Sequence, residues 1–165
     1  MKTSFNSVIY MLFIISISLI FSCKQERNSL DGYVEKDLLS EGIPLKIKAP
    51  EDVKVEVSVR NFYKEIKVKN DKGYFLQILS TEKTSGDIAS LLSELKEEVK
   101  KDPYFSRFIV EMESGFVFEK KTQDGKLNYD FRHIKVGENQ QFVFQSGMYG
   151  IFTQEQVIKM FKSVH

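Results

Sequence analysis

Residues 53–59, Val53-Lys-Val-Glu-Val-Ser-Val59, alternate four valines with polar or charged side chains. Successive side chains of a β-strand point to opposite faces, so this spacing predicts a strand with one buried face and one face in water. Ile66 and Val68 repeat the pattern against charged neighbours, and residues 70–73 form a turn signal. The stretch therefore predicts a half-buried β-sheet as the framework of the domain.

Further strands are predicted on both sides of this stretch. Pro44 and Pro50 bracket an alternating first or edge strand over residues 42–50. Residues 74–79 are apolar on both faces apart from Gln77, which predicts a central strand covered on both sides. After the mid-chain helix come four more strand segments, at 108–113, 116–121, 127–136 and 142–145. Ile134 and Val136 have the opposite parity to Leu127, Tyr129 and Phe131, so a bulge or bend is expected near His133.

Two helices are predicted from apolar spacing and end signals. Thr84-Ser-Gly-Asp87 fits a capping box, and the stripe Ile88, Leu91, Leu92, Leu95 and Val99 follows it. Thr153 and Gln156 form a second capping box, with Phe152 placed to pack on Val157. Hairpin-length turns join most of the strands. The expected fold class is therefore α+β, with a mostly antiparallel sheet of about seven or eight strands and two packed helices.

The first 23 residues read as an export signal. Residues 8–21 are apolar except for Tyr10, Ser16 and Ser18, a length typical of a signal-peptide core and short of a membrane span. Leu19-Ile-Phe-Ser-Cys23 resembles the lipobox of bacterial lipoproteins, which implies a signal peptide over 1–22 and lipid attachment at Cys23. The alternatives are an uncleaved signal anchor and a secretory signal without lipid. Residues 23–41 are then a lipid-anchored tether and 42–165 the globular domain, although Tyr33-Val34 or Leu38-Leu39 could dock on that domain.

Composition narrows the function classes. Removing residues 1–22 takes away one basic residue, Lys2, and leaves basic and acidic groups in balance, which argues against nucleic-acid binding. Cys23 is the only cysteine, so no disulfide is available. Lys24-Gln-Glu26 resembles the short tag of some surface-exposed lipoproteins. The expected location is the bacterial cell envelope, lipid-anchored at the outer membrane, on its periplasmic or surface face.

The domain resembles the family built on the PsbP fold, which includes bacterial lipoproteins. The resemblance rests on Gly42-Ile-Pro-Leu-Lys-Ile-Lys-Ala-Pro-Glu51, the mid-chain helix and the closing Ile158-Lys-Met-Phe-Lys-Ser-Val164. It implies a PsbP-like sandwich and an accessory role on a larger assembly, with no shared catalytic residue. The metal-binding motifs of some members have no match here, so we expect no metal or other cofactor.

No catalytic constellation stands out in the sequence. His133 and His165 are the only histidines, and with Glu111 and Glu113 they make a chance pattern more readily than a zinc site. Ser146 lacks the preceding glycine of a nucleophile elbow. We therefore expect that the protein is not an enzyme.

Two aromatic connections are candidate partner-binding sites. They contribute Tyr104, Phe105, Met148 and Tyr149, whose side chains either contact a partner or fill the hydrophobic core. The expected function is a non-catalytic binding or accessory module for a protein or envelope component. Alternatives are a lipoprotein that binds a small molecule or glycan for uptake and a divergent hydrolase.

Overall fold

The structure is a computed structural model in which residues 30–83 and 87–165 are described. Within this part of the chain, one compact unit extends from Gly32 to His165. The predicted signal peptide and Cys23 lie outside the described residues. Among the helices that are described, none combines the length and the apolar composition needed to span a membrane.

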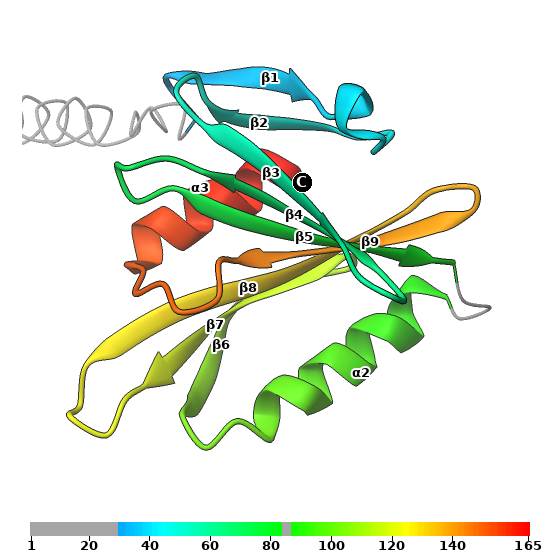
Figure 1. Ribbon diagram of the computed structural model, residues 1–165. Coiled ribbons are helices and arrows are strands. Elements are labelled where there is room, and N and C mark those ends of the chain that lie inside the picture. The colour runs from blue at the N-terminus through cyan, green and yellow to red at the C-terminus, as the bar shows by residue number, and fades with distance from the viewer. Residues whose placement is uncertain (1–29, 84–86) are drawn as a thin grey trace, which may run out of the picture. The chain divides into compact units, whose positions relative to one another are not determined.

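The described residues fold into two antiparallel sheets and two α-helices, which confirms the predicted α+β class (Figure 1). A two-stranded sheet pairs β1 (Tyr33–Asp37) with β2 (Lys46–Pro50), and the short 3-10 helix η1 (Leu39–Glu41) lies between them. The seven-stranded sheet has the order β3-β4-β5-β9-β8-β7-β6. Its strands are β3 (Lys54–Val59), β4 (Lys64–Lys69), β5 (Phe75–Glu82), β6 (Phe105–Met112), β7 (Gly115–Lys121), β8 (Leu127–Val136) and β9 (Gln140–Ser146).

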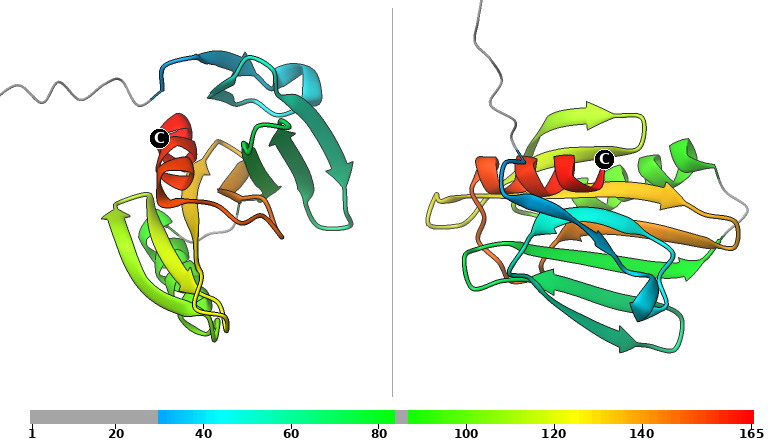
Figure 2. Two further views of the ribbon diagram at one scale, coloured as in Figure 1. Left: turned by 90° about the vertical axis from the view of Figure 1, so that its left-hand side faces the viewer. Right: turned by 90° about the horizontal axis from the view of Figure 1, so that it is seen from above.

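The two helices cover opposite faces of the large sheet. Helix α3 (Gln154–Val164) and the small sheet lie on one face, and α2 (Ile88–Lys100) lies on the other (Figure 2). Strand β7 shows the division. Val117 packs in the hydrophobic cluster on the α3 side of the sheet, which we call the α3 core. Its neighbours Phe116 and Phe118 pack in the cluster on the α2 side, the α2 core. The large sheet is therefore buried on both sides over β7 and β8.

The folded unit begins before residue 42, where the sequence placed the domain boundary. Strand β1 pairs with β2 over its whole length, from Tyr33 opposite Pro50 to Asp37 opposite Lys46. Leu38 is only 1% exposed and belongs to the α3 core. Both segments that were expected to be able to dock, Tyr33-Val34 and Leu38-Leu39, are therefore part of the domain, and the predicted tether was too long.

Of the bulge or bend expected near His133, the bulge is wrong. Strand β8 pairs with β7 over Leu127–His133 and with β9 over His133–Val136, without a register shift in either ladder. The apolar residues change parity along β8 because both faces of the strand are covered. Phe131 packs in the α3 core and Ile134 packs in the α2 core. The register shifts lie instead between β6 and β7.

The helix ends agree with the prediction at α3 and differ at α2. Thr153 and Gln156 form the predicted capping box. Helix α2 is capped instead by Asp87, whose side chain accepts a hydrogen bond from the backbone N–H of Ser90 at 2.7 Å. The expected cap residue, Thr84, lies outside the described residues.

Candidate functional site

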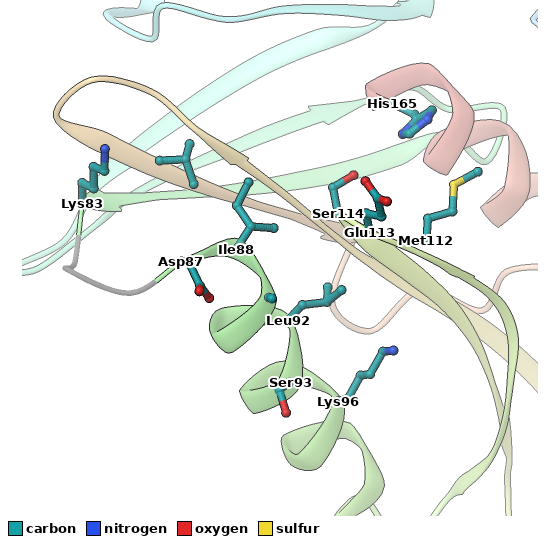
Figure 3. Close-up of a pocket in the computed structure, with 12 residues that line it drawn as sticks. Lys83, Asp87, Ile88, Leu92, Ser93, Lys96, Met112, Glu113, Ser114 and His165 are labelled. Carbon is teal, nitrogen blue, oxygen red and sulfur yellow. The ribbon is translucent and has the colours of Figure 1, made fainter.

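A groove lies at the end of the large sheet where α2 begins. It has a volume of about 1280 Å³ and lies between the first turns of α2 and the β6–β7 turn (Figure 3). Ile88, Leu92, Met112 and Val136 give it an apolar lining, and Lys83 and Glu113 are among its charged residues. We call this cavity the α2 groove.

A second cavity of about 1000 Å³ adjoins the first. Pro44 and Leu45 line it on one side, and the β8–β9 hairpin supplies His133, Lys135 and Val136. We call it the hairpin groove. The two cavities share Ile88, Ser114, Val136 and His165 as lining residues, so together they make one extended site.

His133 is the buried polar side chain of this site. It is 2% exposed, and its ring lies edge-on to Phe161 and His165, at centroid distances of 5.8 and 5.7 Å. Its Nδ1 is 3.4 Å from Ser114 Oγ, whereas its Nε2 is buried without a hydrogen-bond partner. Burial, together with charge repulsion from Lys135 and His165, lowers the pKa of His133 to about 4. His133 is therefore neutral at pH 7.

Lys135 is the half-buried cation of the hairpin groove. Its Nζ lies over the ring of Phe144, 5.8 Å from the centroid. Among residues 30–83 and 87–165, no carboxylate oxygen lies within 4.0 Å of this Nζ. Burial lowers the pKa of Lys135, because the charged form is poorly solvated. The Phe144 ring is therefore its electrostatic partner, and no carboxylate among the described residues neutralises its charge.

The structure brings the two histidines together but does not complete a zinc set. Glu111 pairs with Lys96 at 2.6 Å. No group of three or more potential metal-ligating side chains is found in the described part of the chain. Metal chemistry at this site therefore has no ligand set among the described residues.

Ser114 and His133 resemble a nucleophile and base only in part. A general base works best when its pKa is near the working pH, and the pKa of about 4 makes His133 a weak one. Among the described residues, no carboxylate bonds His133 Nε2 to orient the ring. Ser114 and His133 therefore lack the third group of a nucleophile–base set in the part of the chain that the structure describes.

The predicted partner-binding residues divide into two groups. Phe105 packs against Phe108 and Phe118 at centroid distances of 5.0 and 6.3 Å, so it fills the α2 core. Tyr104 is 39% exposed. Met148 is 54% exposed and Tyr149 is 98% exposed. The exposed residues remain available to a partner, and Phe105 is a core residue.

Tyr149 has an unusual backbone. Its φ of 69° makes it the one non-glycine residue with a positive φ in the described part of the chain. That conformation is unfavourable for a residue with a Cβ. Ile151, two residues later, is 80% exposed. The β9–α3 connection thus presents Met148, Tyr149 and Ile151 as an exposed apolar loop, and the sequence analysis had missed Ile151.

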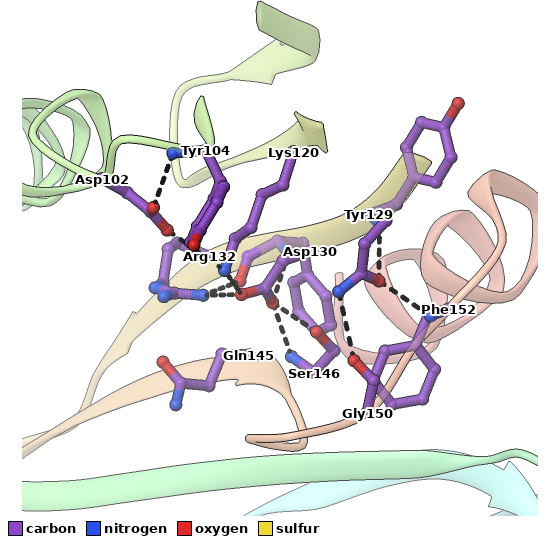
Figure 4. A network of polar contacts seen from close by, with 12 residues as sticks. Asp102, Tyr104, Lys120, Tyr129, Asp130, Arg132, Gln145, Ser146, Gly150 and Phe152 are labelled. Carbon is purple, nitrogen blue, oxygen red and sulfur yellow. Dashed lines mark hydrogen bonds and ion pairs between the residues drawn. The ribbon is translucent and has the colours of Figure 1, made fainter. Parts of the chain in front are cut away.

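Outside the grooves, Asp130 is the centre of a buried polar network (Figure 4). It accepts hydrogen bonds from the hydroxyl and the backbone N–H of Ser146. Its carboxylate also lies 2.9 Å from Arg132 Nη1 and 3.5 Å from Lys120 Nζ. Because its charge and hydrogen bonds are satisfied internally, we assign Asp130 a structural role.

No protein-family model, curated protein or solved structure matches the chain. The resemblance to PsbP-fold lipoproteins therefore stays a prediction from the sequence.

Burial of His133 predicts a pH dependence of stability. The unfolded side chain titrates near pH 6.5 and the folded one near pH 4, so the unfolded state binds the proton first as the pH falls. Stability contributed by the neutral ring is present above pH 6.5 and is lost between pH 6.5 and 4. The full shift corresponds to about 3 kcal/mol, and roughly 2 kcal/mol remains after allowance for solvent screening at the groove.

Urea unfolding followed by circular dichroism at several pH values measures this loss. Acidic groups also titrate below pH 5, so the comparison is with His133→Gln, which retains them. We expect the wild type to lose more stability than this variant between pH 6.5 and 5. If the free energies of unfolding of the wild type and of His133→Gln change with pH in parallel, His133 does not take up a proton on unfolding, and the inferred pKa shift is wrong.

Proposed function

We propose that the domain is a non-catalytic binding module of a lipid-anchored envelope protein, and that it binds a small molecule in the α2 and hairpin grooves. The observation that carries this proposal is the extended, mostly apolar cavity at one end of the sheet. Ligand sites are commonly concave, apolar and furnished with a few polar groups. Here those polar groups include His133, Ser114 and Lys135.

The lipobox-like segment supports the placement in the envelope. Acylation at Cys23 would hold the binding domain next to a membrane, since two or more acyl chains anchor a protein stably. A domain so placed binds molecules that enter, leave or reside in the envelope. This role agrees with uptake or carriage of a small molecule better than with catalysis.

Filling the grooves tests this proposal. Ala89 lines the α2 groove and is exposed, and Leu39 lines the hairpin groove and is 63% exposed. Ala89→Trp and Leu39→Trp therefore add bulk without opening the core. Ser90→Trp is the matched control, because Ser90 is also exposed, follows Ala89 on α2 and lines neither groove.

Each full-length form is purified from its native envelope, and the bound small molecules are extracted and quantified by mass spectrometry. We expect a species that co-purifies with the wild type and with Ser90→Trp, and that falls about tenfold in at least one groove variant. Equal retention by all four forms, or no species above a mock purification, contradicts the proposal.

A second candidate is protein docking through the exposed apolar loop. Tyr149 favours it, because an aromatic side chain that is 98% exposed, on a backbone with an unfavourable φ, contributes little to the core. Aromatic residues of this kind are typical anchors of protein interfaces. The loop and the grooves are separate surfaces, since none of its three apolar residues lines either groove.

A further inference from the structure

The hairpin groove combines three features that together select a ligand. It has in Lys135 a cation that no described carboxylate neutralises, an unsatisfied buried ring nitrogen in His133, and apolar walls that continue into the α2 groove. We propose that it binds the anionic end of a small amphiphile, a carboxylate or a phosphate, against Lys135 and His133, with the apolar part of the molecule extending toward Ile88. This inference rests on the proposed function, and it specifies the class of ligand.

Comparison with other half-buried cations shows why Lys135 points to an anion. Lys96, Lys120 and Arg132 have side-chain exposures of 25%, 25% and 16%, and each lies within 3.5 Å of a carboxylate oxygen. Lys135 is similarly half-buried and has no such partner among the described residues. Removing a cation from water without an anion is costly, so an anionic ligand would relieve this cost.

His133 supplies a directional donor beside this charge. When Ser114 Oγ donates its hydrogen bond to Nδ1, the ring proton of the neutral imidazole is on Nε2. That N–H is buried and needs an acceptor, which the described residues do not provide. A carboxylate or phosphate oxygen at this position would accept it and would also neutralise Lys135.

The polar lining of the groove agrees with an anionic ligand. Lys135 supplies the positive charge, His133 and His165 add ring nitrogens, and Glu138 is the one acidic side chain of the lining among the described residues. Glu138 is exposed on the β8–β9 turn and forms no ion pair with Lys135. The apolar walls, which include Leu45, Val136 and Ile88, exclude a ligand that is charged throughout.

The test uses the full chain in phosphatidylcholine nanodiscs, with isotope-labelled isoleucine methyl groups. Ile88 and Ile134 line the hairpin groove, and Ile88 also lines the α2 groove, so their NMR signals report on its occupancy. The probes are octanoate, octyl phosphate and octanol, which share one apolar chain length. Nanodiscs without protein correct for partition of each probe into the bilayer.

We expect octanoate and octyl phosphate to bind about tenfold more tightly than octanol. Lys135→Met should reduce both anions to the affinity of octanol and leave octanol unchanged, whereas Lys135→Arg should retain the preference. Lys126→Met is the matched control, because Lys126 is 76% exposed in the β7–β8 turn, away from both grooves.

The outcomes distinguish failure of this inference from failure of the proposed function. Equal binding of the three probes overturns the anion inference and leaves the groove as a ligand site. No methyl shift with any probe overturns both. A shift when phosphatidylglycerol replaces phosphatidylcholine, without added probe, supports the inference and identifies membrane lipid as the source. A shift only with free octanoate or octyl phosphate supports it and identifies a free amphiphile.

Discussion

Replacing Asp130 by alanine should lower the free energy of unfolding by about 3 kcal/mol. Asp130 is 8% exposed, and its carboxylate compensates both Arg132 and Lys120 while accepting two hydrogen bonds from Ser146. The substitution leaves two half-buried cations without their nearest anion. Breaking a buried ion pair from one side is costly for this reason, and a typical domain has only about 5–15 kcal/mol of stability.

Urea unfolding of the Gly32–His165 unit, followed by circular dichroism, measures this loss. Asp130→Asn should be less destabilising than Asp130→Ala, because the amide oxygen still accepts a hydrogen bond. The matched control is Asp124→Ala, which removes a 54% exposed carboxylate that pairs with Lys126 at 2.6 Å. Exposed pairs contribute little, so this control should unfold like the wild type. Equal stability of Asp130→Ala and Asp124→Ala would rule out the structural role of Asp130.

Replacing Cys23 by alanine should abolish lipid attachment completely. Cys23 is the only thiol of the chain, so no other residue can carry a thioether-linked lipid. Lipidation precedes cleavage in the lipoproteins that the lipobox resembles, so we expect the predicted signal peptide of this variant to remain uncleaved. Incorporation of labelled palmitate and the mass of the N-terminal peptide measure both effects.

The control for this experiment is Ser22→Ala, which retains a small residue before the cysteine and should be labelled like the wild type. Absence of label from the wild type itself, with residues 1–22 retained, would establish the uncleaved signal anchor instead. Absence of label with those residues removed would indicate a secretory signal without lipid.

The sequence predicts the fold well where one residue pattern decides one element. The alternating valines of β3 and the apolar stripe of α2 are local signals, and both elements form where they were expected. The buried face expected for β3 is only partly present, because Val57 and Val59 are exposed. Strand β8 was misread because a change of parity has two causes, a bulge or a change of the covered face. Only the position of α2 beneath Ile134 distinguishes them. Strand β1 was missed because its short, mostly exposed sequence depends on pairing with β2.

The candidate site was less accessible to sequence reasoning. The grooves bring together η1, α2, the β6–β7 turn and the β8–β9 hairpin, which are distant along the chain. His133 was noted only as one of two histidines, and Lys135 was not singled out. Lys135 lies between two apolar residues, Ile134 and Val136, and this was the one local signal of an unusual environment. The exposed aromatic of the β9–α3 loop was predicted because two glycines flank the Met148–Tyr149 pair.

Photo-crosslinking in living cells shows whether the grooves hold a small molecule, with photo-methionine incorporated in place of methionine. Met112 is 44% exposed and lines the α2 groove, Met148 is 54% exposed on the apolar loop, and Met160 is 1% exposed and serves as an internal negative control. One molecule thus carries the same reactive group at both candidate surfaces. We expect a small-molecule adduct on the peptide that contains Met112. Protein crosslinks at Met148 together with an unmodified Met112 would contradict this expectation.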